Sequence, residues 1–272
     1  MYANATLLVK MKKILFINHE ITPYTAETHL SLMGRKAPQN AQDHGCEIRT
    51  FMPKWGDINE RRGQLHEVQR LSGMNIVIND TDHPLIIKVA SIPQTKIQVY
   101  FIDNEEYFYK SKIESPALQD CAERAIFFAR GVIETMKKLR WSPDIIHCQG
   151  WMSYLVPLYI KQAYKDEPVV NNAKIVTSLF SDEPSVPLEK DIKQRIAFKD
   201  ITVESLADYD DTFTNTELAR IAIDNSDGII AASEGIREEI LKIAEESSAK
   251  YLPFTGEDFG DAYMKFYDSL FD

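Results

Sequence analysis

The stretch "KKILFINHEITPYTAETHLSLMGRKAP", residues 12–38, decides how the chain begins to fold. Its apolar run at residues 14–17 predicts a buried strand, and residues 30–44 predict a helix that ends at Gly45. In nucleotide-binding α/β proteins, the loop between such a strand and helix carries glycines, which let the backbone approach a phosphate at the helix N-terminus. No glycine occurs here between Asn18 and Met33. The sequence therefore raises the question of what replaced the phosphate loop.

The remaining sequence alternates strand-like and helix-like segments. Strands are predicted at residues 46–53, 143–148, 173–180 and 227–233, and helices at residues 120–140, 151–164, 217–225 and 234–246. Three closely spaced strand-like runs, at residues 74–80, 84–92 and 96–103, predict hairpins and hence a small antiparallel β insertion. Because helical crossovers join the other strands, the pattern predicts a doubly wound, mostly parallel, Rossmann-like α/β sheet. Residues 184–211 are expected to be helical in pieces.

The two ends of the chain have different patterns. Residues 1–10 are expected to form a loose extension, because their apolar patch is short and precedes the charges, unlike a secretory signal. Met1 and Met11 are both candidate start residues. Near the other end, four apolar residues share one helical stripe: Tyr263, Phe266, Tyr267 and Leu270. They predict a helix that docks back onto a single domain of residues 11–272.

Composition excludes several classes of partner. The 272 residues are 44% hydrophobic and carry a formal net charge of −10, which disfavours nucleic acid and anionic membranes. No apolar stretch approaches the roughly 20 residues of a membrane span. Cys46, Cys121 and Cys148 have no CxxC spacing, which indicates buried thiols in a reducing cytoplasm. No residue pattern indicates a metal site or a bound cofactor.

Several segments together resemble one enzyme family. "ILFINHEITPY" and "HGCEIRTFMPKW" resemble the opening of bacterial glycogen and starch synthases, glycosyltransferases of the GT-B type and of family 5. Further segments agree with the family in order: "FIDNEEYF", "DCAERAIFFARGVIETMKKLRWSPDIIHCQGWMSYLVPLYIK", "AKIVTSLF" and "IDNSDGIIAASEGIREEI". The resemblance implies the N-terminal Rossmann-like half of a two-domain enzyme that transfers glucose from ADP-glucose to an α-glucan. The nucleotide-binding second half is not expected before the chain ends at Asp272.

The family's phosphate-binding motif is replaced in this chain. After its first strand the family has a lysine, one residue and paired glycines, which hold the phosphates of the donor. The corresponding positions carry Ala26, Glu27, Thr28 and His29. An anionic Glu27 would repel a diphosphate, and Thr28 has a Cβ where close backbone approach is needed. The resemblance therefore implies a degenerate donor site.

Two further family motifs are also replaced. The family's His-Asp-Trp-His-Thr corresponds here to residues 149–153, which read Gln-Gly-Trp-Met-Ser and place Gly150 at the aspartate position. The family's histidine that faces the reacting sugar corresponds to Phe180, which forms no hydrogen bond through its side chain. Because glycosyl transfer needs groups that stabilise developing charge, these replacements predict a protein that is catalytically inactive alone.

Five residues are candidates for a remaining substrate site. His19 and Glu20 follow the first strand, at the edge where open α/β sheets bind ligands. Gln149, Trp151 and Tyr154 follow the strand that contains His147, and the two aromatic rings could stack on glucose or simply pack in the core. His147 itself is expected to be a hydrogen-bonded core residue.

Two functions stay open on the sequence. The first is a synthase-like, non-catalytic module that binds an α-glucan or a protein in glycogen metabolism. The second is a glucosyltransferase subunit completed by a separate nucleotide-binding chain. The replaced motifs favour the first, because a partner would not restore them. The cleft face is expected to be refilled by apolar residues or covered by a second copy or a partner chain.

Overall fold

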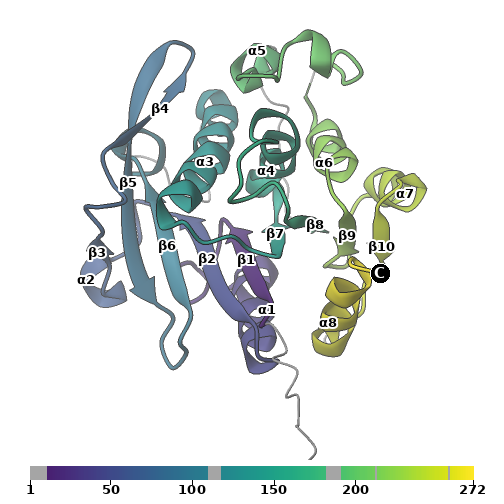
Figure 1. Cartoon of the computed structure of the whole chain (residues 1–272), viewed down its shortest axis with the longest axis horizontal. Helices are drawn as coiled ribbons and strands as arrows, with labels where there is room; N and C mark the ends of the chain where they lie inside the picture. Colours follow the sequence, from purple (N-terminus) through teal and green to yellow (C-terminus); the bar gives the residue numbers. More distant parts are fainter. Residues whose placement is uncertain (1–10, 110–117, 182–190, 212, 257) are drawn as a thin grey trace, which may run out of the picture.

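A mixed, mostly parallel β-sheet crosses the whole molecule (Figure 1). The computed structural model describes residues 11–109, 118–181, 191–211, 213–256 and 258–272, and the side chains of residues 118–121 are not described. The strand order is β10-β9-β8-β7-β1-β2-β6-β5-β3, with β4 paired to β5. The parallel strands are β1 (Lys13–Asn18), β2 (Glu47–Pro53), β6 (Gln98–Asp103), β7 (Ile145–Gln149), β8 (Lys174–Leu179), β9 (Gly228–Ala231) and β10 (Lys250–Leu252). The predicted doubly wound α/β sheet is confirmed.

The strand register places one edge of the sheet at a topological switch point. From β1 the chain winds outward through β2 and β6, and then it returns to β7 and winds the other way through β8, β9 and β10. Asn18 pairs with Gln149, and Gln149 pairs with Ser178, so the carboxyl ends of these three strands lie level. Ligands of open α/β sheets bind at such an edge. The residues that follow β1, β7 and β8 therefore lie where a ligand of this fold would bind.

The predicted hairpins are confirmed between β4 and β5 and between β5 and β6, although the third predicted run, β6, also pairs parallel with β2 in the main sheet. Strands β3 (His66–Glu67), β4 (Met74–Ile78) and β5 (Thr81–Ser91) pair antiparallel, with β5 joining β6. Alternating buried and exposed residues in β5 fit a strand that has one face in the core. The insertion extends one side of the sheet (Figure 1, left).

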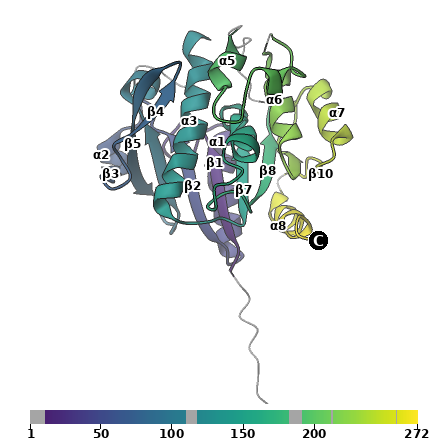
Figure 2. The ribbon, with the colours of Figure 1, turned by 45° about the horizontal axis from the view of Figure 1, so that its top comes forward.

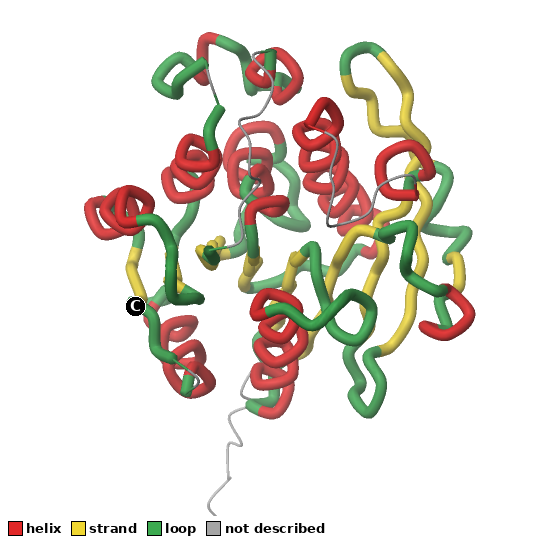
Figure 3. The backbone as a smooth tube through the Cα atoms, turned by 180° about the vertical axis from the view of Figure 1, so that it is seen from behind, coloured by secondary structure: helices red, strands yellow, loops and turns green. Residues whose placement is uncertain are grey.

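Helices cover both faces of the sheet (Figures 1 and 2). On one face lie α3 (Leu118–Leu139), α4 (Leu155–Leu158) and α6 (Asn215–Asp224), and on the other lie α1 (His29–Asp43) and α8 (Phe259–Ser269). The shorter or peripheral helices are α2 (Glu60–Gly63), α5 (Ile192–Ile196) and α7 (Glu238–Glu246). Figure 3 shows α1 and α8 side by side from behind. No helix in the described ranges is long and apolar enough to cross a membrane.

The helix predicted at residues 151–164 is wrong as a continuous element. The segment divides into the 3₁₀ turn η2 (Trp151–Ser153), α4 and the π turn η3 (Tyr159–Ala163). Pro157 has no amide hydrogen to donate to the carbonyl of Ser153, so the first turn cannot continue as a regular α-helix. Two further irregular turns are η1 (Glu105–Tyr109) and η4 (Glu204–Leu206). Within residues 184–211, α5 and η4 are the described helical pieces, and residues 182–190 lie outside the description.

Helix α8 packs against the sheet through its aromatic stripe. Tyr263, Phe266 and Tyr267 are buried. The Tyr267 hydroxyl lies 2.7 Å from Nδ1 of His147, and Nε2 of His147 lies 2.6 Å from Oγ of Ser178. Burial lowers the pKa of His147 to about 3, so the ring is neutral at physiological pH. His147 is a hydrogen-bonded core residue, as expected.

Candidate functional site

The loop between β1 and α1 folds back on the first turn of α1. We call the residues gathered here the β1–α1 corner: His19, Glu20, Thr28, His29, Gly150 and Phe180. Thr28 is the N-cap of α1, and its Oγ1 accepts a hydrogen bond from the Ser31 amide at 3.0 Å. In return, the Thr28 amide donates to Oγ of Ser31 at 2.8 Å. This capping box satisfies helix-terminal donors that a phosphate would otherwise use.

A carboxylate lies beside the same helix terminus. The hydroxyl of Thr28 donates to Oε2 of Glu20 at 2.5 Å, and the Glu20 amide donates to Oδ1 of Asn18 at 3.0 Å. Burial raises the pKa of Glu20, and the hydrogen bond from Thr28 opposes that rise. The position next to the N-terminus of α1 is thus filled by an acidic side chain of the chain itself.

His29 joins α1 to the far side of the sheet edge. Its Nε2 donates to the carbonyl oxygen of Ala232, just after β9, at 2.9 Å. Its ring lies 5.9 Å from the ring of Phe180, which is only 3% exposed. His29, which stands at the family's second glycine position, therefore contacts the residues that follow β8 and β9.

Gly150 and His19 fit each other closely. Gly150 has a left-handed φ of +79°, and a Cβ at this position would lie 2.8 Å from Cε1 of His19 and 3.0 Å from Cδ2 of Leu30. The aspartate that the family resemblance places here has no room in this arrangement. Burial lowers the pKa of His19 to about 3, so its ring is neutral, and the ring lies edge-on 5.8 Å from Trp151.

Three of the candidate substrate-binding residues are buried in the core, whereas Ala26 is exposed. Gln149 is fully buried, and its Oε1 accepts a hydrogen bond from Nδ2 of Asn18 at 3.4 Å. Trp151 is 7% exposed and Tyr154 is 2% exposed, so both rings pack within the fold. Ala26 lies exposed on the loop. Trp151 and Phe180 are buried within the chain, so neither ring lies exposed at the sheet edge.

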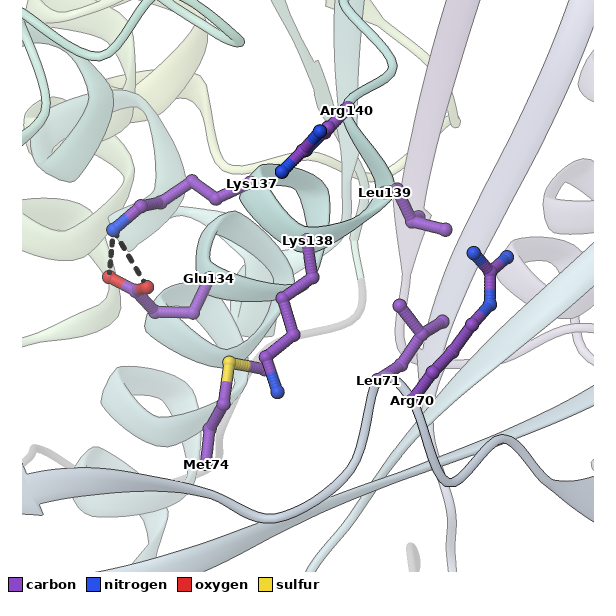
Figure 4. A pocket seen from close by; sticks show the side chains of 8 residues that line it. All are labelled: Arg70, Leu71, Met74, Glu134, Lys137, Lys138, Leu139 and Arg140. Atoms are coloured by element: carbon purple, nitrogen blue, oxygen red, sulfur yellow. Dashed lines mark hydrogen bonds and ion pairs between the residues drawn. The ribbon is translucent and has the colours of Figure 1, made fainter.

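Two cavities elsewhere on the molecule differ in character. One of about 700 Å³ lies at the C-terminal end of α3 and is rich in basic side chains, including Arg70, Lys138 and Arg140 (Figure 4). Lys137 in the same cavity pairs with Glu134 at 2.9 Å. Lys137, Lys138 and Arg140 at the end of α3 complement the helix dipole, whereas Arg70 comes from the segment between β3 and β4.

A smaller cavity of about 470 Å³ adjoins the β1–α1 corner. Its lining includes His29, Lys36, Ser181, Ser233 and Phe254. The Ser181 amide donates to Oγ of Ser233 at 2.8 Å, so the ends of β8 and β9 are joined here. Across the described part of the chain, no three His, Cys, Asp or Glu side chains come together as metal ligands.

A third cavity was not anticipated from the sequence. This side groove, of about 670 Å³, lies between Tyr24 of the β1–α1 loop, residues 57–64 around α2, and residues 91–95 at the end of β5. Its residues come from three separate segments, none of which carries a motif. The clusters of Asn, Gln and Thr in these turns are the only local signal that could have indicated it.

Comparison with known proteins places these features in a family. A family model described as "Starch synthase catalytic domain" matches residues 13–252. The glycogen synthase of Chlorobium phaeovibrioides is 37% identical over 172 residues, which are 61% of this chain and 35% of that protein. The glycogen synthase of Chlorobium chlorochromatii is 38% identical over 173 residues, with the same shares. The chain matches about a third of the length of these curated relatives.

Solved structures share the fold at lower sequence identity. The catalytic domain of starch synthase IV from Arabidopsis thaliana, bound to ADP and acarbose, superposes with a TM-score of 0.74 at 15% identity. The superposition covers 90% of this chain and 51% of that one. A sucrose-phosphate synthase from Thermosynechococcus elongatus has a TM-score of 0.52 at 13% identity, covering 96% of this chain and 100% of that one. These likenesses concern the fold.

Proposed function

The chain belongs to the starch synthase catalytic domain family, and from that premise we propose that it binds an α-glucan without transferring glucose on its own. The observation that carries the proposal is the closed β1–α1 corner. There, Thr28, Glu20 and His29 use their hydrogen-bonding groups on one another and on the neighbouring backbone. A donor phosphate would need those same positions.

Electrostatics support the loss of donor binding. A diphosphate is stabilised by cations and by free amide groups at a helix N-terminus. Here Glu20 lies against the cap of α1, the loop carries the acidic Glu27, and the position that the family resemblance gives to a lysine holds the uncharged Ala26. A diphosphate at this terminus would meet like charge, so its binding would be weakened.

The reacting sugar also lacks a polar partner at the expected place. Phe180 occupies the position that the family resemblance gives to a histidine, and its ring packs near His29. The imidazole of His29 already donates to Ala232. Groups that stabilise charge during glycosyl transfer would have to come from elsewhere.

Binding of a glucan is supported by family and fold. The matching relatives are glycogen synthases, and the starch synthase IV structure contains acarbose, an oligosaccharide. Under this proposal residues 11–272 act as one domain in the cytoplasm, within glycogen metabolism. A second copy or a partner protein over the cleft edge is an extension of the same proposal, which light scattering over a range of concentrations tests.

The decisive experiment combines titration with a transfer assay. Isothermal titration of the chain with maltoheptaose should show binding, whereas ADP and ADP-glucose should give no heat of binding. Radiolabelled ADP-glucose with glycogen should give no incorporation. ADP-glucose binding or incorporation by the chain alone would overturn the proposal. Incorporation only after addition of a nucleotide-binding chain would instead establish the glucosyltransferase-subunit function.

A further inference from the structure

We propose that the side groove, rather than the sheet edge, is where this chain holds a short α-glucan segment, an inference that rests on the proposed glucan binding. The groove measures about 670 Å³, within the range of about 300–1,000 Å³ that is usual for small-molecule sites. Its three walls are the β1–α1 loop, α2 with the residues before it, and the turn after β5.

The polar side chains of the groove suit an uncharged polyhydroxyl ligand. They include the amides of Gln64 and Gln94, one cation in Arg62 and one carboxylate in Asp57. Such groups offer paired donors and acceptors, which match neighbouring sugar hydroxyls. The lining side chains carry one positive and one negative charge, and Arg35 donates to the carbonyl oxygen of Pro93 beside them at 3.2 Å. The cavity at the end of α3 carries four basic side chains and would suit an anion better. The weaker positive charge of the groove therefore favours a sugar over a phosphate.

These polar groups are available because the fold does not use them. Arg62, Gln64, Gln94 and Asp57 are exposed, and within the described ranges their side chains form no hydrogen bond or ion pair with the rest of the protein. By contrast, the side chain of Asn59, at the same groove, accepts from the Arg62 amide at 2.9 Å and caps α2. The groove thus has a rigid base and free groups at its rim.

Tyr24 supplies an aromatic surface that is held in place. Its hydroxyl donates to the carbonyl oxygen of Ser91 at 2.9 Å, and its ring packs edge-on 5.0 Å from Phe101. Burial raises the pKa of Tyr24 to about 12, so the hydroxyl stays protonated. The half-buried ring still lines the groove. An aromatic ring fixed before the ligand arrives lowers the entropic cost of stacking on a sugar.

Both groove glutamines have an unusual backbone. Gln64, at the C-terminal end of α2, has φ +55°, and Gln94, in the turn after β5, has φ +66°. A left-handed backbone is uncommon for a side chain of this kind and costs free energy, so the surrounding structure must fix it. The fold therefore sets the backbone at two positions on walls contributed by different segments, while the amide groups of both side chains stay free to meet a ligand.

The test compares the wild-type chain with the double variant Arg62→Ala/Gln94→Ala. Titration with maltoheptaose should show a dissociation constant about tenfold or more higher in the double variant, because two polar partners of the ligand are lost. Lys96→Ala is the matched control, since Lys96 is exposed on the same turn and does not line the groove. It should bind as the wild type does. Thermal unfolding of all three proteins verifies that each is folded.

The outcomes separate this inference from the proposed function. If the folded double variant bound maltoheptaose as tightly as the wild type, the glucan would bind elsewhere. The inference about the side groove would then be overturned, while the proposed glucan binding would stand. Absence of maltoheptaose binding by the wild-type chain would overturn both. Amide chemical-shift changes on maltoheptaose addition should centre on Tyr24, Arg62 and Gln94, and changes centred on Trp151 and Phe180 would contradict the inference.

Discussion

The β1–α1 corner and the side groove share the loop between β1 and α1, but they differ in whether their polar side chains are hydrogen-bonded within the fold. In the corner, Thr28, Glu20 and His29 satisfy one another or the backbone. In the groove, Gln64 and Gln94 keep their amides free toward solvent. Polar residues at a sheet edge therefore do not by themselves indicate a binding site. What matters is whether their hydrogen-bonding capacity is already used within the fold.

This comparison predicts that substitutions in the corner affect stability, whereas substitutions in the groove affect binding. The largest effect is expected for Gly150→Asp, which restores the residue that the family resemblance implies. A Cβ at 2.8 Å from His19 and a left-handed φ of +79° should together cost about 4 kcal/mol of unfolding free energy. Urea denaturation measures the change.

Gly45→Asp is the matched control for that variant. Gly45 has a φ of +83°, but nothing lies within 4 Å of a Cβ built there. Its loss should therefore reflect backbone strain and the carboxylate at the C-terminal end of α1, without any steric contact, about 1–2 kcal/mol in all. Equal losses in the two variants would show that contact with His19 is not what closes the corner.

The second prediction concerns acid, because the buried rings of His19 and His147 are neutral. The folded-state pKa values of His19 and His147 are about 3, against 6.5 for an ordinary histidine. The unfolded chain therefore binds more protons between these values, so the stabilising contribution is complete above pH 6.5 and falls as the pH drops toward 3. Each histidine contributes a slope of about 1.4 kcal/mol per pH unit in that window.

Urea unfolding at pH 7.5 and pH 5.5 measures this dependence. The two histidines together should lower the free energy of unfolding by about 3 kcal/mol at the lower pH. His19→Gln should lose about half of the dependence, whereas His66→Gln, at an exposed position, should retain it. An unchanged slope in His19→Gln would mean that the corner does not hold this ring neutral.

A smaller loss is expected from the helix cap. Thr28→Ala removes the acceptor for the Ser31 amide and the donor to Glu20, and should cost about 1 kcal/mol. Thr28→Ser preserves both hydrogen bonds and should remain within a few tenths of the wild type. Thermal and urea unfolding compare the two. Equal stability of the alanine and serine variants would show that the capping box contributes nothing.

The smallest effect on stability is expected in the groove. Arg62→Ala and Gln94→Ala should each change the free energy of unfolding by less than about 0.5 kcal/mol, because neither side chain bonds to the described fold. A loss as large as that of Thr28→Ala would show that the groove side chains support the structure. Substitutions in the groove would then affect stability as those in the corner do, which would contradict the comparison between the two regions.

Short apolar runs made most of the sheet predictable from the sequence. The continuous runs of β1, β7 and β8 and the three closely spaced runs between residues 74 and 103 each predicted a strand, because a strand buried on both faces is apolar along its length and one buried on a single face alternates. Strand β10 was missed, since three residues with intermediate or full exposure carry no pattern. The break in residues 151–163 was missed because Pro157 acts on the local hydrogen bonds inside an apolar segment.

The site was predictable only in part. The sequence showed which residues stand at the edge, including His19, Thr28 and Phe180, but not that Thr28 would bond to Glu20 or that Gly150 would fit His19. Such pairings depend on distances between segments that are far apart in the chain. The side groove was invisible for the same reason, because its walls come from three segments.

The hydroxyl of Tyr267 reaches a histidine 120 positions earlier in the chain. Until α8 docks, one flank of the central strand β7 lacks its cover and the His147 ring lacks this partner. The packing around His147 is therefore complete only after α8, which is synthesised long after β7, has docked onto the sheet. Folding of this protein thus includes a contact between distant segments that forms late. Amide hydrogen exchange in β7 should consequently report on the detachment of α8.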